Sequence, residues 1–179
     1  AAEVGYLFDL LVDFITRELP DLEKRGVRLK ILGEVADLPF AARKTLAHAC
    51  ARPAGGDKKH LNLALNYSGR EELARACRKF MESGEPVSAL TPEKLSEHLY
   101  TAGQPDPDLI IRTSGELRIS NFLLFQGAYS ELYFCETLWP DFGPEDLRKA
   151  FEHYRGRSRR FGALDLELIN LGAQKSRAD

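Results

Sequence analysis

The chain has 179 residues, of which 27 are acidic and 25 are Lys or Arg, so its formal net charge is only -2. Hydrophobic residues make up 44% and charged residues 29%, a composition typical of a folded globular domain and not of a disordered, collagenous or low-complexity protein. A chain so close to neutrality is a poor polyelectrolyte partner for DNA or RNA. We therefore expect no nucleic-acid partner, and any anion site has to be local.

The longest uninterrupted apolar runs are four residues, 122–125 and 132–135, whereas a membrane-spanning helix needs about 18 or more. Three scattered cysteines form neither a disulfide framework nor a Cys-x-x-Cys pair, which predicts reduced thiols and a cytoplasmic location. The sequence begins at Ala1 without an initiator Met or a signal-peptide pattern. We therefore expect a piece of a longer cytoplasmic protein.

Apolar residues recur every three or four positions from Val4 to Leu22, which predicts a long amphipathic helix that ends at Gly26. Thr91 and Pro92 supply an N-cap and a first-turn proline for a short helix. The predicted elements are, in chain order, helix 2–25, strand 27–32, helix 39–51, strand 61–66, a helix after 69, helix 91–100, strand 108–111, helix 121–128, strand 131–134, helix 143–160 and a tail over 163–179.

Strands and helices alternate along the chain. This alternation predicts a single α/β domain over 1–179, with a mostly parallel central sheet and helices on both faces, because parallel neighbours need helical crossovers. Ligands of such sheets lie beyond the carboxyl ends of the strands. No Gly-x-Gly-x-x-Gly, Walker-type or Gly-x-Ser-x-Gly motif occurs, which removes the best support for a nucleotide-binding or serine-hydrolase function.

The most informative segment for chemistry is 108–126. Arg112 directly follows a predicted strand, and Arg118 and Ser120 precede the helix predicted from Asn121, with Ser120 as its N-cap. A helix N-terminus offers free N–H groups, and two guanidinium groups beside it make a cradle for a diphosphate. The sequence therefore predicts an anion site here.

The alternative is that both arginines are surface residues that pair with Asp108 and Glu116. Further along the chain, Glu131 begins a predicted strand in a mostly apolar neighbourhood. Mg²⁺ prefers one or two protein carboxylates together with phosphate oxygens, so Glu131 is the candidate metal ligand. The alternative for Glu131 is a strand-edge acid that faces water.

Asn66 is the last residue of the strand predicted at 61–66, and Tyr67 and Arg70 follow it. They are at the carboxyl end of a parallel strand, and we expect them to line the same crevice as the anion site. A role in forming the turn after the strand is an equally good interpretation.

Five motifs, in this order between residues 61 and 162, resemble those of the cis-prenyltransferases, and most closely undecaprenyl diphosphate synthases. They are LNLALNYSGR at 61–70, RTSGELRISNFLLFQ at 112–126, AYSELYF at 128–134, LWPDF at 138–142 and RRFG at 159–162. The resemblance implies an enzyme that adds isopentenyl diphosphate repeatedly, with cis geometry, to an allylic diphosphate such as farnesyl diphosphate, and makes a long-chain polyprenyl diphosphate.

The resemblance also implies a Mg²⁺ cofactor, a homodimer and a long apolar tunnel for the product, and it leaves open a peripheral contact with the inner face of a membrane. By the resemblance, six residues would hold the isopentenyl diphosphate or complete its site, and one would help to bind Mg²⁺. The first group is Arg112, Arg118, Ile119, Ser120 and, across the dimer, Arg160 with Gly162; the metal ligand is Glu131.

The sequence departs from the family pattern at its beginning. The family opens with Asp-Gly-Asn-Gly-Arg-Trp, whose Asp is essential, and a Phe-Ser-x-Glu-Asn-Trp segment follows; neither occurs here. We therefore expect the catalytic Asp to be upstream of this chain. Smaller departures are Ser68, Ser114, Leu117 and Phe125. The alternative function is a non-catalytic subunit that resembles the enzyme and stabilises a catalytic partner, which the retained arginines and Glu131 oppose.

Overall fold

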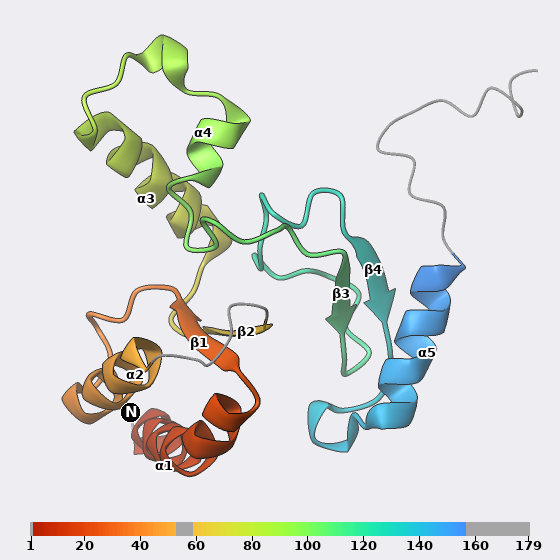
Figure 1. Cartoon of the computed structure of the whole chain (residues 1–179). Helices are drawn as coiled ribbons and strands as arrows, with labels where there is room; N and C mark the ends of the chain where they lie inside the picture. The colour runs from red at the N-terminus through yellow and green to blue at the C-terminus, as the bar shows by residue number, and fades with distance from the viewer. Residues whose placement is uncertain (1, 53–58, 157–179) are drawn as a thin grey trace, which may run out of the picture. The chain divides into compact units, whose positions relative to one another are not determined.

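The computed structural model describes residues 2–52 and 59–156. Figure 1 shows its helices and strands, coloured by residue number from red at the N-terminus to blue toward the C-terminus. In chain order they are α1 (Ala2–Lys24), β1 (Val27–Leu32), α2 (Phe40–Ala51), β2 (Lys59–Ala64), α3 (Gly69–Glu82), η1 (Val87–Ala89), α4 (Pro92–Ser96), β3 (Leu109–Arg112), β4 (Glu131–Phe134), η2 (Trp139–Asp141) and α5 (Pro144–Arg155).

The chain divides into two compact units. The first unit consists of Ala1–Pro105 together with Asn121–Phe125, and the second consists of Asp106–Ser120 together with Gln126–Asp179. The chain therefore passes from one unit to the other after Pro105, after Ser120 and again after Phe125. The single domain over 1–179 stays a prediction.

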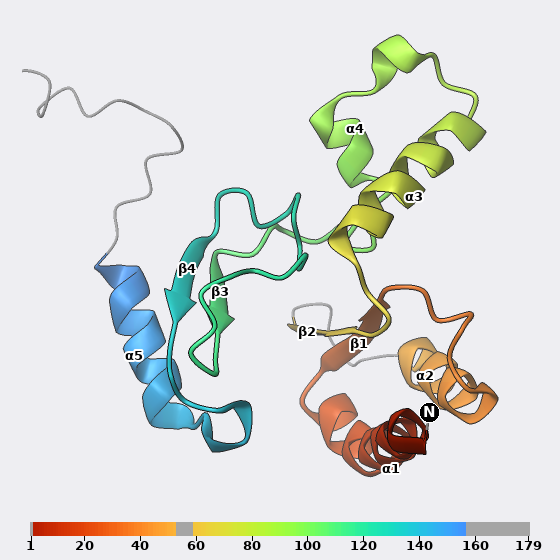
Figure 2. The same ribbon diagram turned by 180° about the vertical axis from the view of Figure 1, so that it is seen from behind.

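In the first unit, β1 and β2 pair in parallel, from Val27 opposite Lys59 to Leu32 opposite Ala64. Helices α1 and α2 pack beside them, as Figures 1 and 2 both show. One cluster of buried apolar side chains joins these elements and consists of Ile15, Leu29, Leu38, Leu46 and Ala49. The burial of this cluster fixes the two strands and leaves their carboxyl ends free to form loops.

In the second unit, β3 and β4 pair in parallel, from Leu109 opposite Glu131 to Arg112 opposite Phe134. Helix α5 lies beside β4 (Figure 2). Tyr133 of β4 contacts the ring of His153 of α5, with ring centroids 5.3 Å apart. The loop after β3 and the beginning of β4 therefore belong to one packed body.

The predicted α/β fold with parallel strands is confirmed. The boundaries of the strands at 27–32 and 131–134 agree with the prediction. Among residues 2–52 and 59–156, however, the strands form two separate two-stranded sheets. One central sheet with helices on both faces is therefore not seen within these ranges.

The helix predicted over 121–128 is wrong, because this stretch consists of turns and bends. Ser120, Asn121 and Leu123 have φ values of 47°, 65° and 45°, in the left-handed region that a right-handed helix does not contain. Ser120 therefore caps no helix, and a helix N-terminus at Asn121 contributes nothing to an anion site. The helix predicted over 91–100 is also shorter, since α4 ends at Ser96.

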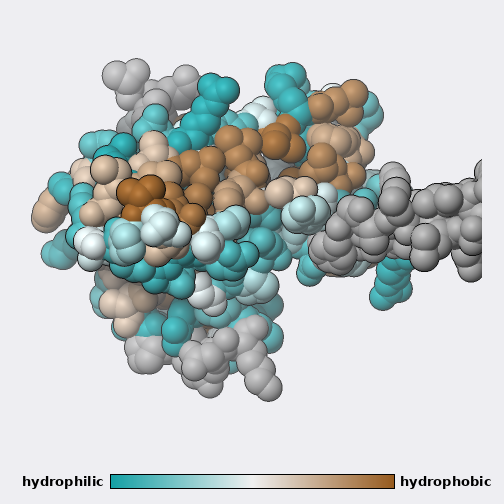
Figure 3. Space-filling model, turned by 90° about the horizontal axis from the view of Figure 1, so that it is seen from above, coloured by the Kyte–Doolittle hydropathy of each residue, from teal (hydrophilic) through white to brown (hydrophobic). Residues whose placement is uncertain are grey.

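No helix among the described residues is long and apolar enough to cross a membrane. Several large apolar side chains are nevertheless exposed, and apolar atoms are visible on the face shown in Figure 3. In the first unit these side chains include Tyr6, Leu7, Leu10 and Phe14 of α1, and in the second unit they include Leu132, Leu138 and Trp139. The predictions for Arg160, Gly162 and the tail 163–179 lie outside the described residues.

Candidate functional site

The loop that leaves β3, residues 113–120, is built as the sequence predicts for a strand end. Arg112 is the last residue of β3, and its carbonyl accepts a hydrogen bond of 3.0 Å from the N–H of Cys135. The N–H of Ser114 donates to the carbonyl of Thr137, and the N–H of Gly115 donates to the carbonyl of Cys135, both at 2.9 Å. The first turn of the loop is therefore fixed to the segment after β4.

Left-handed backbone makes this turn possible, because Ser114 and Gly115 have φ values of 69° and 68°. A Cβ at Gly115 would lie 2.5 Å from a carboxylate oxygen of Glu136, the movable end of a flexible side chain, so the positive φ is what favours glycine there. Thr137 is held in turn by a hydrogen bond of 3.3 Å from its hydroxyl to the carboxylate of Asp146, at the start of α5. The half-buried Arg112 consequently stands at the foot of a constrained loop.

The far half of the loop carries the other predicted ligands of the diphosphate. Arg118 is 68% exposed and forms an ion pair with Glu116, so the pairing weighed as an alternative for Arg118 is present. An exposed pair of this kind is weak, and a diphosphate can displace the carboxylate. Ile119 is half-buried and Ser120 is exposed. The loop thus presents one strand-end arginine, one exposed arginine and one hydroxyl within nine residues.

Glu131, the predicted metal ligand, is half-buried at the first position of β4 and has interactions of its own. It stands opposite Leu109, whereas Arg112 stands opposite Phe134. Because the strands are parallel, Glu131 and Arg112 lie at opposite ends of the pair, about 10 Å apart along the strands. The register gives the backbone positions of the two residues, and the role of Glu131 as a metal ligand stays a prediction. Within the described ranges, no group of three or more His, Cys, Asp or Glu could hold a metal ion.

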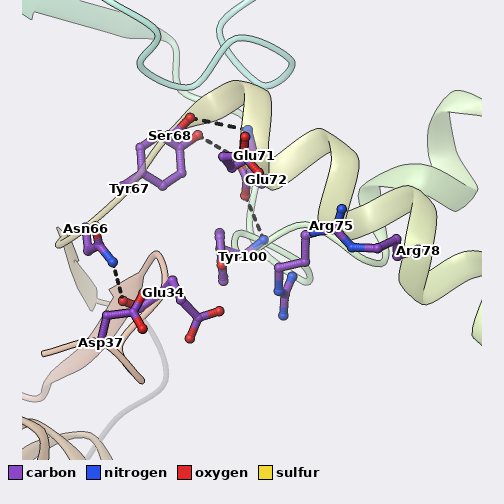
Figure 4. A pocket seen from close by; sticks show the side chains of 10 residues that line it. All are labelled: Glu34, Asp37, Asn66, Tyr67, Ser68, Glu71, Glu72, Arg75, Arg78 and Tyr100. Atoms are coloured by element: carbon purple, nitrogen blue, oxygen red, sulfur yellow. Dashed lines mark hydrogen bonds between the residues drawn. The ribbon is translucent and has the colours of Figure 1, made fainter.

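A cavity of about 420 Å³ opens in the first unit at the carboxyl ends of β1 and β2 (Figure 4). Asn66 and Tyr67 line it, whereas Arg70 is not among its lining residues; that they share a crevice with the anion site stays a prediction. Asn66 also has the turn role, because its side-chain amide donates 2.9 Å to the carbonyl of Glu34. Ser68 caps α3 by accepting a hydrogen bond of 3.3 Å from the N–H of Glu71.

Glu72 holds the wall of this cavity together and is only 1% exposed. Its carboxylate accepts a hydrogen bond of 2.5 Å from the Tyr67 hydroxyl and one of 2.8 Å from the N–H of Tyr100. Burial raises the pKa of Tyr67, and the hydrogen bond to Glu72 raises it further. The guanidinium of Arg75 lies 4.2 Å from the centre of the Tyr100 ring. Both tyrosines are therefore held as neutral phenols by a buried network.

The charges around this cavity argue against a diphosphate there. Four carboxylate side chains and two arginines line it, namely Glu34, Asp37, Glu71, Glu72, Arg75 and Arg78. An acidic surplus repels a diphosphate. Arg112 and the loop 113–120 remain the candidate anion site of the described chain, with Arg112 and Arg118 as its cations.

The structure adds residues that the sequence did not single out. Glu72 is one, and Asn121 is the other, since Asn121 forms three hydrogen bonds with the N-terminus of α3. The motif at 66–70 is the sequence feature that points to these two residues, because its polar side chains need hydrogen-bond partners. Asn121 is 51 or more residues away from its partners in this motif, so no local pattern identifies it, whereas Glu72 is five residues from Tyr67.

A family model described as "Putative undecaprenyl diphosphate synthase" matches residues 1–162. Among the curated proteins, the "Isoprenyl transferase" of Heliobacterium mobile is 47% identical over 168 residues, which are 92% of this chain and 65% of that protein. The "Isoprenyl transferase" of Agrobacterium fabrum is 45% identical over 176 residues, 96% of this chain and 71% of that protein. The chain thus spans about two thirds of the length of these relatives.

Two solved structures are also similar. Lavandulyl diphosphate synthase from Lavandula x intermedia, in complex with dimethylallyl diphosphate, has a TM-score of 0.85 and 33% identity and covers 90% of this chain and 72% of its own. A "probable undecaprenyl diphosphate synthase" from Campylobacter jejuni has a TM-score of 0.80 and 31% identity and covers 90% of this chain and 76% of its own.

Proposed function

This chain belongs to the family of undecaprenyl diphosphate synthases, and we propose that it serves in a cis-prenyltransferase that condenses isopentenyl diphosphate with an allylic diphosphate. The two relatives named isoprenyl transferase support the reaction class. The solved relative that holds dimethylallyl diphosphate supports an allylic diphosphate as one substrate. Farnesyl diphosphate is the proposed starter, and undecaprenyl diphosphate is the proposed product.

The observation that carries this proposal is the constrained loop 113–120. It joins the strand-end Arg112 to Arg118 and Ser120 on a backbone fixed by hydrogen bonds to Cys135 and Thr137. We propose that Arg112 and Arg118 grip the diphosphate of isopentenyl diphosphate and that Ser120 and Ile119 complete the site. Guanidinium groups bind phosphate oxygens in pairs, so the chief effect of this loop is to orient the alkene.

In the proposed reaction the allylic C–O bond breaks and diphosphate leaves. The terminal alkene carbon of isopentenyl diphosphate then bonds to the allylic carbon, and a proton leaves the new chain. Nothing in the described loop takes that proton or binds the leaving diphosphate. The part we assign to this chain is therefore the binding and orientation of the nucleophilic substrate, with catalysis dependent on a further carboxylate.

A Mg²⁺ ion, when bound, would neutralise diphosphate charge and ease its departure. Glu131 stays the candidate ligand. The opposite positions of Glu131 and Arg112 in the strand pair mean that we assign no step of the reaction to that carboxylate within a single chain.

We also propose a homodimer. The apolar side chains that we propose for the interface between the two copies lie on β4 and in the turn after it. Leu138 and Trp139 of this turn are 57% and 71% exposed. Large exposed aromatic and aliphatic groups of this kind are typical of interface centres. Arg160 and Gly162 remain candidates for completing the neighbour's site.

The test uses a hybrid in which this chain replaces the matched region of the Heliobacterium mobile relative. The hybrid is incubated with farnesyl diphosphate, radiolabelled isopentenyl diphosphate and Mg²⁺, and products are separated by chain length. We expect long-chain polyprenyl diphosphates, and their loss in the Arg112→Ala hybrid. The 179-residue chain alone is expected to bind isopentenyl diphosphate weakly and to form no product.

The parent relative and an Arg148→Ala hybrid serve as controls. Arg148 forms exposed ion pairs with Glu145 and Glu152 on α5, so its loss removes an arginine without touching the loop. A folded hybrid that makes no product while the parent is active would contradict the enzyme proposal. If that hybrid raised the activity of a co-expressed relative, the non-catalytic subunit would be the better assignment.

A further inference from the structure

Asp146 lies in the first turn of α5, and both oxygens of its carboxylate accept hydrogen bonds. Its Oδ2 accepts one of 3.1 Å from the N–H of Gly143, the residue directly before the helix. Its Oδ1 accepts one of 3.3 Å from the hydroxyl of Thr137. The side chain is only 22% exposed, so water has restricted access to these contacts. Asp146 therefore joins the segment after β4 to the N-terminus of α5.

Helix α5 is a firm support for this carboxylate. Ala150, four residues after Asp146, is completely buried. The ring of His153, further along the helix, contacts that of Tyr133 on β4. A contact between Thr137 and the first turn of α5 consequently fixes Thr137 relative to the strand pair.

Thr137 in turn holds the first turn of the diphosphate loop. Its carbonyl accepts the hydrogen bond of 2.9 Å from the N–H of Ser114, the second residue after Arg112. Ser114 has a φ of 69°, a left-handed conformation that is unfavourable for serine and persists only where surrounding contacts hold it. Gly115, which follows, takes its φ of 68° without strain. Ser114 is therefore the strained residue of this turn, and its partner is the residue that Asp146 holds.

We infer that Asp146 is a positioning residue for Arg112 and the loop 113–120. It acts through Thr137, because a Thr137 released from Asp146 is free to shift and to release Ser114. Ser114 then relaxes toward the negative φ values that serine prefers, which redirects the chain two residues after Arg112. A loop that has to be ordered on binding costs free energy, so the diphosphate binds more weakly. Asp146 touches no substrate, every residue in this argument belongs to the second unit, and the inference rests on the proposed function.

The substitutions separate this role from the capping of α5. Thr137→Val removes only the hydroxyl and leaves the bond between Asp146 and Gly143 in place. Asp146→Ala removes both hydrogen bonds. Asp146→Asn keeps both, because its oxygen can accept from Gly143 while its amide donates to the Thr137 hydroxyl. Glu145→Ala is the matched control, since Glu145 is the neighbouring acid in the same helical turn and pairs with Arg148 instead.

The KM for isopentenyl diphosphate is measured in the hybrid enzyme, with farnesyl diphosphate saturating. We expect Thr137→Val and Asp146→Ala each to raise this KM about fivefold, the scale of one lost hydrogen bond, with kcat and the KM for farnesyl diphosphate unchanged. Asp146→Asn and Glu145→Ala should stay within about twofold of the unsubstituted hybrid. The double variant should show no larger KM than Asp146→Ala alone, because both substitutions break the same contact.

Ser114→Gly tests the step through the backbone. Glycine takes the left-handed φ without strain, so the turn no longer depends on Thr137 to hold it. In the Ser114→Gly hybrid, Thr137→Val should therefore change the KM for isopentenyl diphosphate by less than about twofold. The same fivefold rise in both backgrounds would overturn the inference.

A role confined to capping α5 gives a different pattern. Asp146→Ala would then lower the melting temperature and the apparent kcat with both KM values unchanged, and Thr137→Val would behave as the unsubstituted hybrid does. Either result overturns the inference. An active hybrid that depends on Arg112 but tolerates Thr137→Val refutes the inference alone. If the unsubstituted hybrid forms no product, the proposed function fails, and the inference falls with it.

Discussion

Removal of the Glu72 carboxylate should destabilise the first unit more than removal of any neighbouring acid on α3. Glu72 is 1% exposed, and its two oxygens accept from Tyr67 and from the N–H of Tyr100. Glu72→Ala leaves both donors without this acceptor and opens a void of several atoms. Hydrogen bonds to charged groups contribute roughly 1.5–3 kcal/mol each, and water in the adjacent cavity recovers part of that. We expect a loss of about 3 kcal/mol.

Urea unfolding of the 179-residue chain, followed by circular dichroism, measures this loss. Glu71→Ala is the matched control, because Glu71 is the preceding glutamate on the same helix and is exposed; a change within about 0.5 kcal/mol is expected for a surface residue. Glu72→Gln should fall between the two, since its amide oxygen can still accept from Tyr100. If Glu72→Ala unfolds within 0.5 kcal/mol of Glu71→Ala, the network does not carry the stability that its geometry implies.

Three further outcomes are expected. Arg112→Ala and Arg118→Ala should each weaken isopentenyl diphosphate binding about ten- to hundredfold in dialysis, because each removes charge-assisted hydrogen bonds; unchanged binding in both would refute the anion site. Burial raises the pKa of Tyr67 above its ordinary value of 10.0. The contribution of Tyr67 to the free energy of unfolding is therefore complete below pH 10, and above pH 10 it declines by about 1.4 kcal/mol per pH unit. Tyr67→Phe should show a shallower loss of stability at alkaline pH. Trp139→Glu should convert a dimeric hybrid into a monomer in light scattering.

The elements that the sequence predicted well are those set by their own residues. β1 begins directly after Gly26, whose φ is 67°, and α1 ends where this glycine allows a left-handed turn. Alternation of apolar and polar residues and a bounding glycine are local signals. The strand predicted at 131–134 contains an unbroken run of apolar residues instead, which is also a local signal, and it agrees with β4.

The prediction failed where distant contacts decide the backbone. Residues 121–128 contain an apolar run behind a serine, which locally resembles a capped helix. The hydrogen bonds that Asn121 makes with residues 68–70 of α3 replace those of a helix, and three left-handed residues follow from them. A pattern rule applied to one segment has no knowledge of such a partner.

The relation between Arg112 and Glu131 was available from the sequence in principle. Arg112 was placed after the end of one strand and Glu131 at the start of the next, and in a parallel pair these positions lie at opposite ends. The proposed Mg²⁺ role overlooked this consequence. The register now shows it directly, with Glu131 opposite Leu109 and Arg112 opposite Phe134.

This register makes a last prediction about the dimer. A second copy is one source of the Glu131 that serves a cation on the diphosphate held by Arg112. Hybrids with Arg112→Ala and with Glu131→Gln, each inactive alone, should then restore activity when co-expressed, because half of the dimers are mixed and each mixed dimer has one intact site. About a quarter of the unsubstituted activity is expected for random pairing. Activity no higher than the mean of the two separate variants would exclude Glu131 from acting across the dimer.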